Sequence, residues 1–253
     1  MPCPSGEDSP THRQKSGLKR MGLAIELEQI LRASGADIVG FADLRGLSPD
    51  VRENLPFGIS IAVSLNATVV ANIKEGPTEA YDKEYQRANV LLDSLGERTA
   101  QFLREHGHGA KFWPSSNHSR YSSATLSMLL PHKTVATRAG MGWIGKNALL
   151  INTDFGSAIR ITSVLTDAVL PAGVPTDSSQ CGKCSECVTA CPVHAVAGEN
   201  WTAGMERACL VDASTCRTNA ENMTIARIGY PKTICGICIP VCPWTQRYLI
   251  RQS

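Results

Sequence analysis

The sequence predicts an α+β fold in two parts, an α/β domain over residues 21–173 and a cysteine-rich domain over residues 174–253. Two observations place the division. Before residue 171, apolar residues recur at the spacings typical of helices and strands, whereas beyond it Cys, Gly and Pro become frequent. Residues 1–20 are polar and basic, so we expect them to form a disordered leader.

The α/β domain is expected to begin with one helix and two strands. Apolar residues between Leu23 and Leu31 recur at helical spacing, and Gly35 can end that helix. Residues 36–44 form a short β-prone stretch. Apolar residues alternate along the chain over residues 59–65, which predicts a half-buried strand.

A longer helix and further strands complete this domain. A helical pattern opens at Thr78 and runs to about Glu105, where Gly107 can end it. The remaining elements are a strand at 110–113, a polar loop at 115–123, a helix at 133–139 ended by Gly140, and strands at 148–151 and 158–165. The turn-forming composition of residues 152–156 predicts that the last two strands form a hairpin.

Two cysteine runs in the second part indicate its chemistry. Residues 181–192 read CGKCSECVTACP, which has the spacing of the iron–sulfur run of two-cluster bacterial ferredoxins, and residues 235–243 read CGICIPVCP, a partial second copy. A zinc ribbon needs paired C-x-x-C knuckles rather than a triplet, a disulfide framework suits a short secreted chain, and a C-x-x-C redox motif needs only two thiols. The sequence therefore predicts two [4Fe–4S] clusters in a bacterial-ferredoxin-like domain.

Two clusters with four thiolates each need eight of the ten cysteines. Lys232 stands where the second run would have its first Cys, so one ligand must come from elsewhere. Cys3 lies in the leader, which leaves Cys209 and Cys216. Because the last Cys of each run serves the other cluster, we expect one cluster to take Cys181, Cys184, Cys187 and Cys242, and the other to take Cys191, Cys235, Cys238 and either Cys209 or Cys216. The Cys left over is expected to be a small buried hydrophobe.

The composition argues against several other classes of protein. A net charge of +2 gives no strong field for nucleic acid. The sequence has no apolar run of about eighteen residues, and its first twenty residues lack the apolar core of a secretory signal. We therefore expect a cytoplasmic protein, in a reducing compartment and without a membrane partner.

Gly140, Gly142 and Gly145 match the G-x-G-x-x-G pattern of dinucleotide-binding folds. That fold requires a strand before the glycines and a helix after them. Here the predicted helix precedes the glycines and a strand follows, so nicotinamide binding is not expected.

The same stretch, from His132 to Ile151, resembles the glycine-rich signature of the epoxyqueuosine reductase family. Shorter matches to that family occur at residues 155–160, 164–170, 211–216 and 242–244, and the resemblance covers about residues 22–250. Reductive dehalogenases contain less closely matching motifs in the same order along the chain.

The resemblance implies an oxidoreductase with a nitroreductase-like α/β core, a two-cluster ferredoxin module and a cobalamin in the cleft between them. It selects Cys216 as the eighth ligand. It also implies that Gly140, Gly142 and Gly145 approach the corrinoid closely, while Lys146 and Arg160 pair with its polar groups. A flavodoxin or ferredoxin would supply electrons to reduce a modified nucleoside or another small molecule. The alternative is a non-catalytic electron carrier or a corrinoid-reducing accessory protein.

Two departures from the family affect the substrate. Members of the family carry an Asp general acid upstream of the glycines, but residues 113–121 contain no Asp or Glu. His118 or Tyr121 would have to replace it, since reducing an epoxide needs a proton for the leaving oxygen. The helical-repeat extension that the family uses toward tRNA is also not found after Trp244, so the sequence leaves tRNA open as a substrate.

Overall fold

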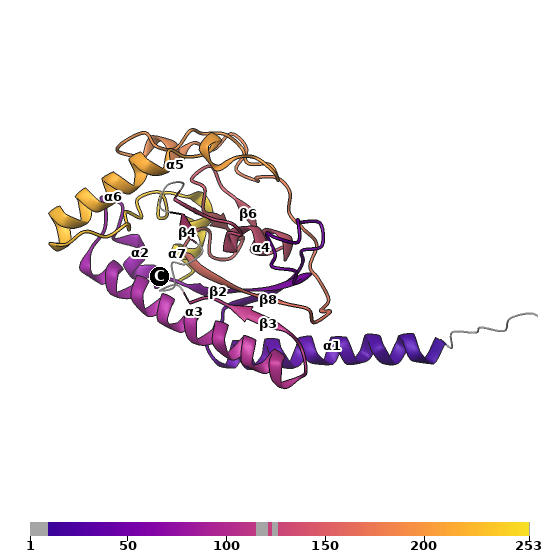
Figure 1. Cartoon of the computed structure of the whole chain (residues 1–253). Helices are drawn as coiled ribbons and strands as arrows, with labels where there is room; N and C mark the ends of the chain where they lie inside the picture. Colours follow the sequence, from indigo (N-terminus) through magenta and orange to yellow (C-terminus); the bar gives the residue numbers. More distant parts are fainter. Residues whose placement is uncertain (1–9, 115–120, 123–125, 253) are drawn as a thin grey trace, which may run out of the picture.

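The computed structural model describes residues 10–114, 121–122 and 126–252 (Figure 1). Its centre is a four-stranded sheet in the order β1-β2-β8-β3, and every neighbouring pair is antiparallel. These strands are β1 (Ile38–Asp43), β2 (Phe57–Ser64), β8 (Ile159–Thr166) and β3 (Ala110–Phe112). All four lie where alternating or β-prone patterns predicted strands.

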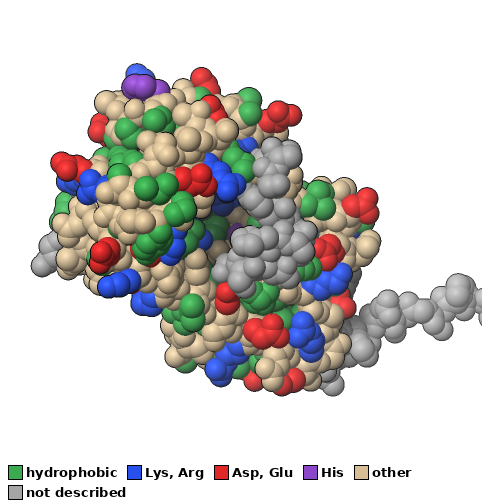
Figure 2. Space-filling view, turned by 60° about the vertical axis from the view of Figure 1, so that its left-hand side comes forward, with side chains coloured by type: hydrophobic (Ala, Val, Ile, Leu, Met, Phe, Trp, Pro, Cys, Tyr) green, Lys and Arg blue, Asp and Glu red, His purple; other side chains and the backbone are tan. Residues whose placement is uncertain are grey.

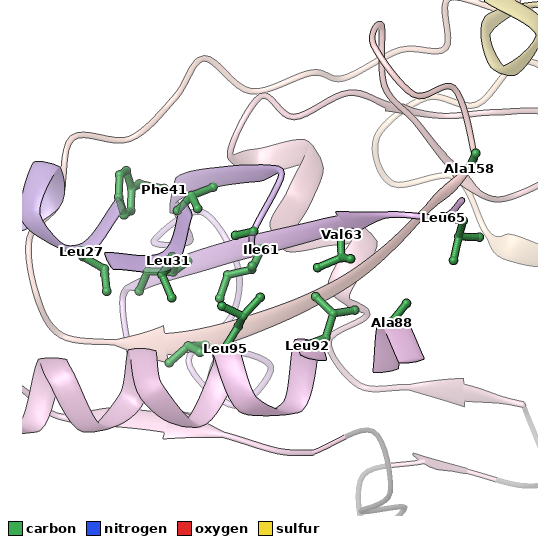
Figure 3. Packing of buried hydrophobic residues seen from close by; sticks show 14 of the residues in the cluster. Leu27, Leu31, Phe41, Ile61, Val63, Leu65, Ala88, Leu92, Leu95 and Ala158 are labelled. Atoms are coloured by element: carbon green, nitrogen blue, oxygen red, sulfur yellow. The ribbon is translucent and has the colours of Figure 1, made fainter. Parts of the chain in front are cut away.

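Two long helices, α1 (Pro10–Ala33) and α3 (Glu79–Glu105), cover one face of the sheet. Leu27 and Leu31 of α1 and Leu95 of α3 meet Ile61 of β2 in a continuous apolar layer (Figure 3). Burying a side chain of this size stabilises the fold by roughly 1.5–3 kcal/mol. The predicted start of α3 is confirmed, because the Thr78 hydroxyl accepts a hydrogen bond of 3.1 Å from the Tyr81 N–H and caps the helix.

The beginning of α1 corrects one expectation. Residues 10–20, expected to be part of a disordered leader, continue the helix toward the N-terminus, and this half of α1 extends beyond the rest of the molecule in Figure 1. Pro10 is compatible with the first turn of a helix, where the N–H that proline lacks has no intrahelical acceptor. Residues 1–9 lie outside the described residues.

The other face of the sheet is covered by α4 (His132–Arg138) and by a hairpin of β6 (Trp143–Ile144) and β7 (Leu150–Ile151). The predicted hairpin between 148–151 and 158–165 is therefore wrong. A turn does form at 152–156, with a bridge between Asn152 and Gly156, but β7 pairs back with β6 while β8 pairs with β2 and β3. The glycines lie between α4 and β6, the order opposite to that of a dinucleotide-binding fold.

The cysteine-rich part contains little regular structure before its last two helices. Its elements are α5 (Glu186–Thr189), η2 (Arg207–Cys209), α6 (Ala213–Ile228) and α7 (Pro243–Arg251). Three shorter elements belong to the first part: α2 (Ala67–Ala71), β4 (Tyr121–Ser122) and β5 (Ser127–Met128). Among the described helices, none is long and apolar enough to cross a bilayer.

The two parts pack directly on each other. The expected boundary at residues 173–174 falls in an extended segment that returns to the sheet, where the Gly173 N–H donates to the Phe41 carbonyl at 2.8 Å. Helix α7 also folds back, and the Tyr248 hydroxyl donates to the Leu65 carbonyl at 2.8 Å. The second part therefore lies against the first over segments distant in sequence.

Candidate iron–sulfur site

The first group of thiols surrounds a cavity of about 90 Å³, whose wall includes Cys181, Cys184, Cys187 and Cys242. The first three lie in the loop before α5 and in its first turn, and Cys242 immediately precedes α7. Burial, and then the neighbouring Cys181 and Cys242, raise the pKa of the Cys187 thiol to about 11. These four sulfurs are the set that the sequence assigned to one cluster.

The second group consists of Cys191, Cys216, Cys235 and Cys238. Burial raises the pKa of Cys238 most, and Cys235, Cys187, Cys216 and Cys191 raise it further. The pKa values of Cys235 and Cys216 are also raised, first by burial and then by other members of the group. The structure thus brings together the four cysteines expected around the other cluster, with Cys187 between the two groups.

Cys216 enters its group from the first turn of α6. Asp212 caps this helix, because its Oδ1 accepts hydrogen bonds of 3.0 Å from the N–H groups of Ser214 and Thr215. Cys209, the other candidate, ends η2. Both cysteines are exposed, but Cys209 is not among the neighbours that raise the pKa values of the grouped thiols. The expectation that the remaining Cys is buried is therefore wrong for Cys209.

The chemistry of both groups fits iron–sulfur clusters. Thiolates are soft ligands, and sets of four are the usual ligands of cubane clusters. In the part of the chain that the structure describes, no three His, Cys, Asp or Glu side chains converge on a point that would hold a single metal ion. The first group instead lines a cavity, as a multi-iron cluster requires.

Lys232, at the position of the missing Cys, connects the second run to the first part of the chain. Its Nζ lies 2.5 Å from Asp82 Oδ1, and the Tyr230 hydroxyl donates to Asp82 Oδ2 at 2.6 Å. Burial alone would raise the pKa of Asp82, but these hydrogen bonds outweigh it and the pKa is lowered. At the position of the missing Cys, Lys232 therefore forms an ion pair with Asp82 of α3.

The three glycines lie close to the chain itself. A Cβ on Gly140 would lie 2.6 Å from the Val174 carbonyl oxygen, and one on Gly142 would lie 2.0 Å from that of Ile151. A Cβ on Gly145 would meet the Ile151 side chain at 2.3 Å. Tight packing between α4, the hairpin and segment 171–176 therefore explains the glycines without a corrinoid.

Lys146 and Arg160 do not share a pocket. Arg160 Nε donates to Asn89 Oδ1 at 3.1 Å, and its guanidinium lies 4.1 Å from the centre of the Tyr85 ring, so it packs against α3. Lys146 follows β6 on the opposite side of the sheet and lines the cavity of the first thiol group. The structure thus separates two side chains that were expected at one cofactor.

His118 and the Tyr121 side chain, the two expected acids, lie outside the described residues. On α4, the structure shows two polar residues that the sequence analysis did not single out. His132 Nδ1 lies 2.7 Å from Ser163 Oγ, and Lys133 Nζ donates to the Ala148 carbonyl. Burial, and then the charge of Arg207, lower the pKa of Lys133 to about 8. A Lys at the start of a short helix gave no sequence signal of this environment.

Comparison with known proteins supports the same picture. Residues 180–245 match the family model described as a 4Fe-4S double cluster binding domain. An epoxyqueuosine reductase from Synechococcus sp. strain CC9605 is 39% identical over 195 residues, which cover 75% of this chain and 56% of the relative. That alignment is longer than either part of the chain alone, so the resemblance to this family is confirmed across both.

Solved structures share the fold. A reductive dehalogenase studied for B12-dependent dehalogenation aligns with a TM-score of 0.68 at 17% identity, covering 97% of this chain and 34% of that one. An epoxyqueuosine reductase bound to an epoxyqueuosine-modified tRNA stem loop aligns with a TM-score of 0.59 at 18% identity, covering 89% and 66%. This chain spans about half the length of the curated relatives it matches. It carries two [4Fe–4S] clusters in a fold common to both enzyme classes.

Proposed function

We propose that this chain is an iron–sulfur oxidoreductase of the epoxyqueuosine reductase type, which uses single electrons from two [4Fe–4S] clusters to reduce a small molecule or a modified nucleoside. The observation that supports this most is the grouping of eight thiols into two sets of four beside an α/β part related to the same reductases. An electron carrier alone would need only the cysteine-rich part.

In this proposal the ligands are Cys181, Cys184, Cys187 and Cys242 for one cluster, and Cys191, Cys216, Cys235 and Cys238 for the other. When bound, the clusters supply one-electron transfer. The chain buries Cys187 and Cys242 and leaves the other ligands partly or fully exposed. Asn147 Nδ2, in the turn between β6 and β7, lies 3.4 Å from the Cys238 carbonyl, which ties the α/β part to the second run. A donor of the flavodoxin or ferredoxin class would reduce the clusters, in a reducing compartment that we take to be the cytoplasm.

The three glycines, Lys146 and Arg160 do not form one binding site for a cobalamin. The dehalogenase with this fold is described as B12-dependent, and a corrinoid would supply a strongly reducing cobalt centre. The residues expected to bind the corrinoid are engaged elsewhere, because the three glycines pack against the chain itself and Arg160 contacts α3. We therefore derive no step through cobalamin.

Figure 2 shows a hollow in one face of the molecule, with basic, His and apolar side chains in its visible wall and an acidic side chain at its edge. Removing an epoxide oxygen takes two electrons and two protons and releases water, leaving an alkene. Lys133 is a candidate proton donor together with His118 and Tyr121, because a pKa of about 8 keeps it protonated at neutral pH but more acidic than an ordinary lysine.

A non-catalytic electron carrier, or an accessory protein that reduces corrinoids, is the second candidate. The observation that favours it is the lack of any Asp or Glu in residues 113–121, where the family carries its acid. Such a protein would donate single electrons to a partner and would need no proton donor of its own.

Turnover by the full chain separates these functions. The protein is purified and reconstituted without oxygen, supplied with cob(II)alamin and reduced flavodoxin, and given a tRNA stem loop that contains epoxyqueuosine. The proposal predicts conversion of the nucleoside to queuosine, measured by mass spectrometry; cobalt EPR reports separately whether cobalamin binds. Cobalamin binding without conversion would favour another substrate or the accessory role. Reducible clusters with neither binding nor conversion would favour the electron carrier.

A further inference from the structure

Lys146 differs from the other buried charged residues of the described chain. Three charged side chains are buried, Asp82 at 2% exposure and Glu84 and Lys146 at 8% each. Asp82 is paired with Lys232, and Glu84 is paired with Arg87 at 2.7 Å. Lys146 has no hydrogen-bond or ion-pair partner among the described residues. Its Nζ is not among the buried side-chain nitrogens that lack a partner in the described chain, so the ammonium group is accessible from the cavity that Lys146 lines, where an anion would stabilise it.

The surroundings of Lys146 identify that anion. Lys146 lines the 90 Å³ cavity together with the four thiols of the first group. The only carboxylate in this wall is that of Glu186, which is exposed to solvent and makes no ion pair with Lys146 among the described residues. Four thiolates around a cubane core carry a net negative charge, which grows by one when the cluster is reduced.

We propose that Lys146 is the built-in counter-charge of the cluster held by Cys181, Cys184, Cys187 and Cys242. This inference rests on the two-cluster function proposed above. A fixed cation beside the cluster stabilises the reduced form more than the oxidised form, and so raises the reduction potential. One electron enters from the low-potential donor, and no bond to the protein forms or breaks.

The cation that acts on the other group is Arg207, whose charge lowers the pKa of Cys216, but Arg207 is exposed and water screens its charge. The other donors to its ligands are neutral, the Ala195 N–H at 3.3 Å from Cys191 Sγ and Asn219 Nδ2 at 3.9 Å from Cys235 Sγ, and the cation of Lys232 is already paired with Asp82. The two clusters should therefore have unequal potentials. The one beside Lys146 is the stronger electron acceptor, and it is the one that the β6–β7 hairpin of the α/β part faces.

Redox titration of the reconstituted full chain, followed by EPR without oxygen, tests this. Lys146→Met removes the charge while keeping a side chain of similar length. The expected result is that one cluster alone becomes about tenfold less reduced at a fixed solution potential, which corresponds to about 59 mV for one electron. Lys146→Arg should restore the wild-type value. Lys183→Gln is the matched control, because Lys183 is exposed between two ligands and water screens its charge.

The outcomes also separate this inference from the proposed function. A Lys146→Met protein with full iron content and two unshifted potentials would overturn the counter-charge while leaving the two-cluster function standing. A shift as large in Lys183→Gln would overturn it too. If the Met variant does not assemble, Lys146→Gln is titrated under the same criterion. Wild-type protein that holds no cluster would instead contradict the function itself.

Discussion

Cys216 and Cys209 show how a single residue decides the ligand set. The cysteine runs leave the eighth ligand open, because both candidates precede the second run by similar distances. In the fold, Cys216 occupies the first turn of a capped helix whose N-terminus faces Cys191, Cys235 and Cys238, whereas Cys209 lies on a short 3-10 turn and is not among the neighbours of these thiols. The spacing supplied the two candidates, and the direction of α6 distinguishes them.

Replacing these two cysteines should have unequal effects. Cys216→Ser should lower the iron content or distort the EPR signal of one cluster, because a serine hydroxyl is a poorer ligand for iron than a thiolate. Cys209→Ser is the matched control and should leave the iron content and both signals near those of the wild type. Iron analysis and EPR of the two variants, reconstituted side by side, check this. The reverse pattern would show that the ligand assignment is wrong.

At the scale of elements, the sequence predicted helix starts and ends correctly where a capping residue or a glycine marks them. Thr78 caps α3 as its sequence context indicates, and Gly140 ends α4 with a positive φ of 72°. The strand at 158–165 was also placed correctly, but its partner was not. Turn chemistry at 152–156 describes only a local reversal, and it does not show that a buried strand gains more by pairing with β2 and β3. Long-range pairing of this kind leaves no local pattern.

The packing of α4 against the hairpin makes Lys133 a source of pH dependence. Its pKa is lowered from 10.5 to about 8 in the folded protein, so between these values the unfolded chain binds more protons and the folded state gains stability as the pH rises. The substitution Lys133→Met removes this pH-dependent contribution to the free energy of unfolding. The stability of the wild type relative to the variant, measured by urea unfolding of the reconstituted proteins, should therefore increase from about pH 8 to pH 10. A constant difference over that range would contradict the environment described for Lys133.

At the scale of the whole molecule, the α/β part and the cysteine-rich part contact each other at several points. Gly156 lies so close to α7 that a Cβ there would meet the Thr245 nitrogen at 2.2 Å, and Thr245 Oγ1 accepts a hydrogen bond of 3.0 Å from the Ser157 N–H. Asp82 and Lys232 make a second connection, and Lys146 contributes to a third. The cysteine runs alone indicated the clusters. That the first part of the chain supplies a cation to one of them follows only from the fold.

The most direct test of the account is a count of iron and acid-labile sulfide in protein prepared and reconstituted without oxygen, with EPR of the reduced sample. Two cubanes predict about eight irons and about eight sulfides per chain, with the signals of two interacting reduced clusters. A colourless protein, or one that retains four irons or fewer and shows a single cluster signal, would contradict the central claim that eight thiols of the second part hold two clusters.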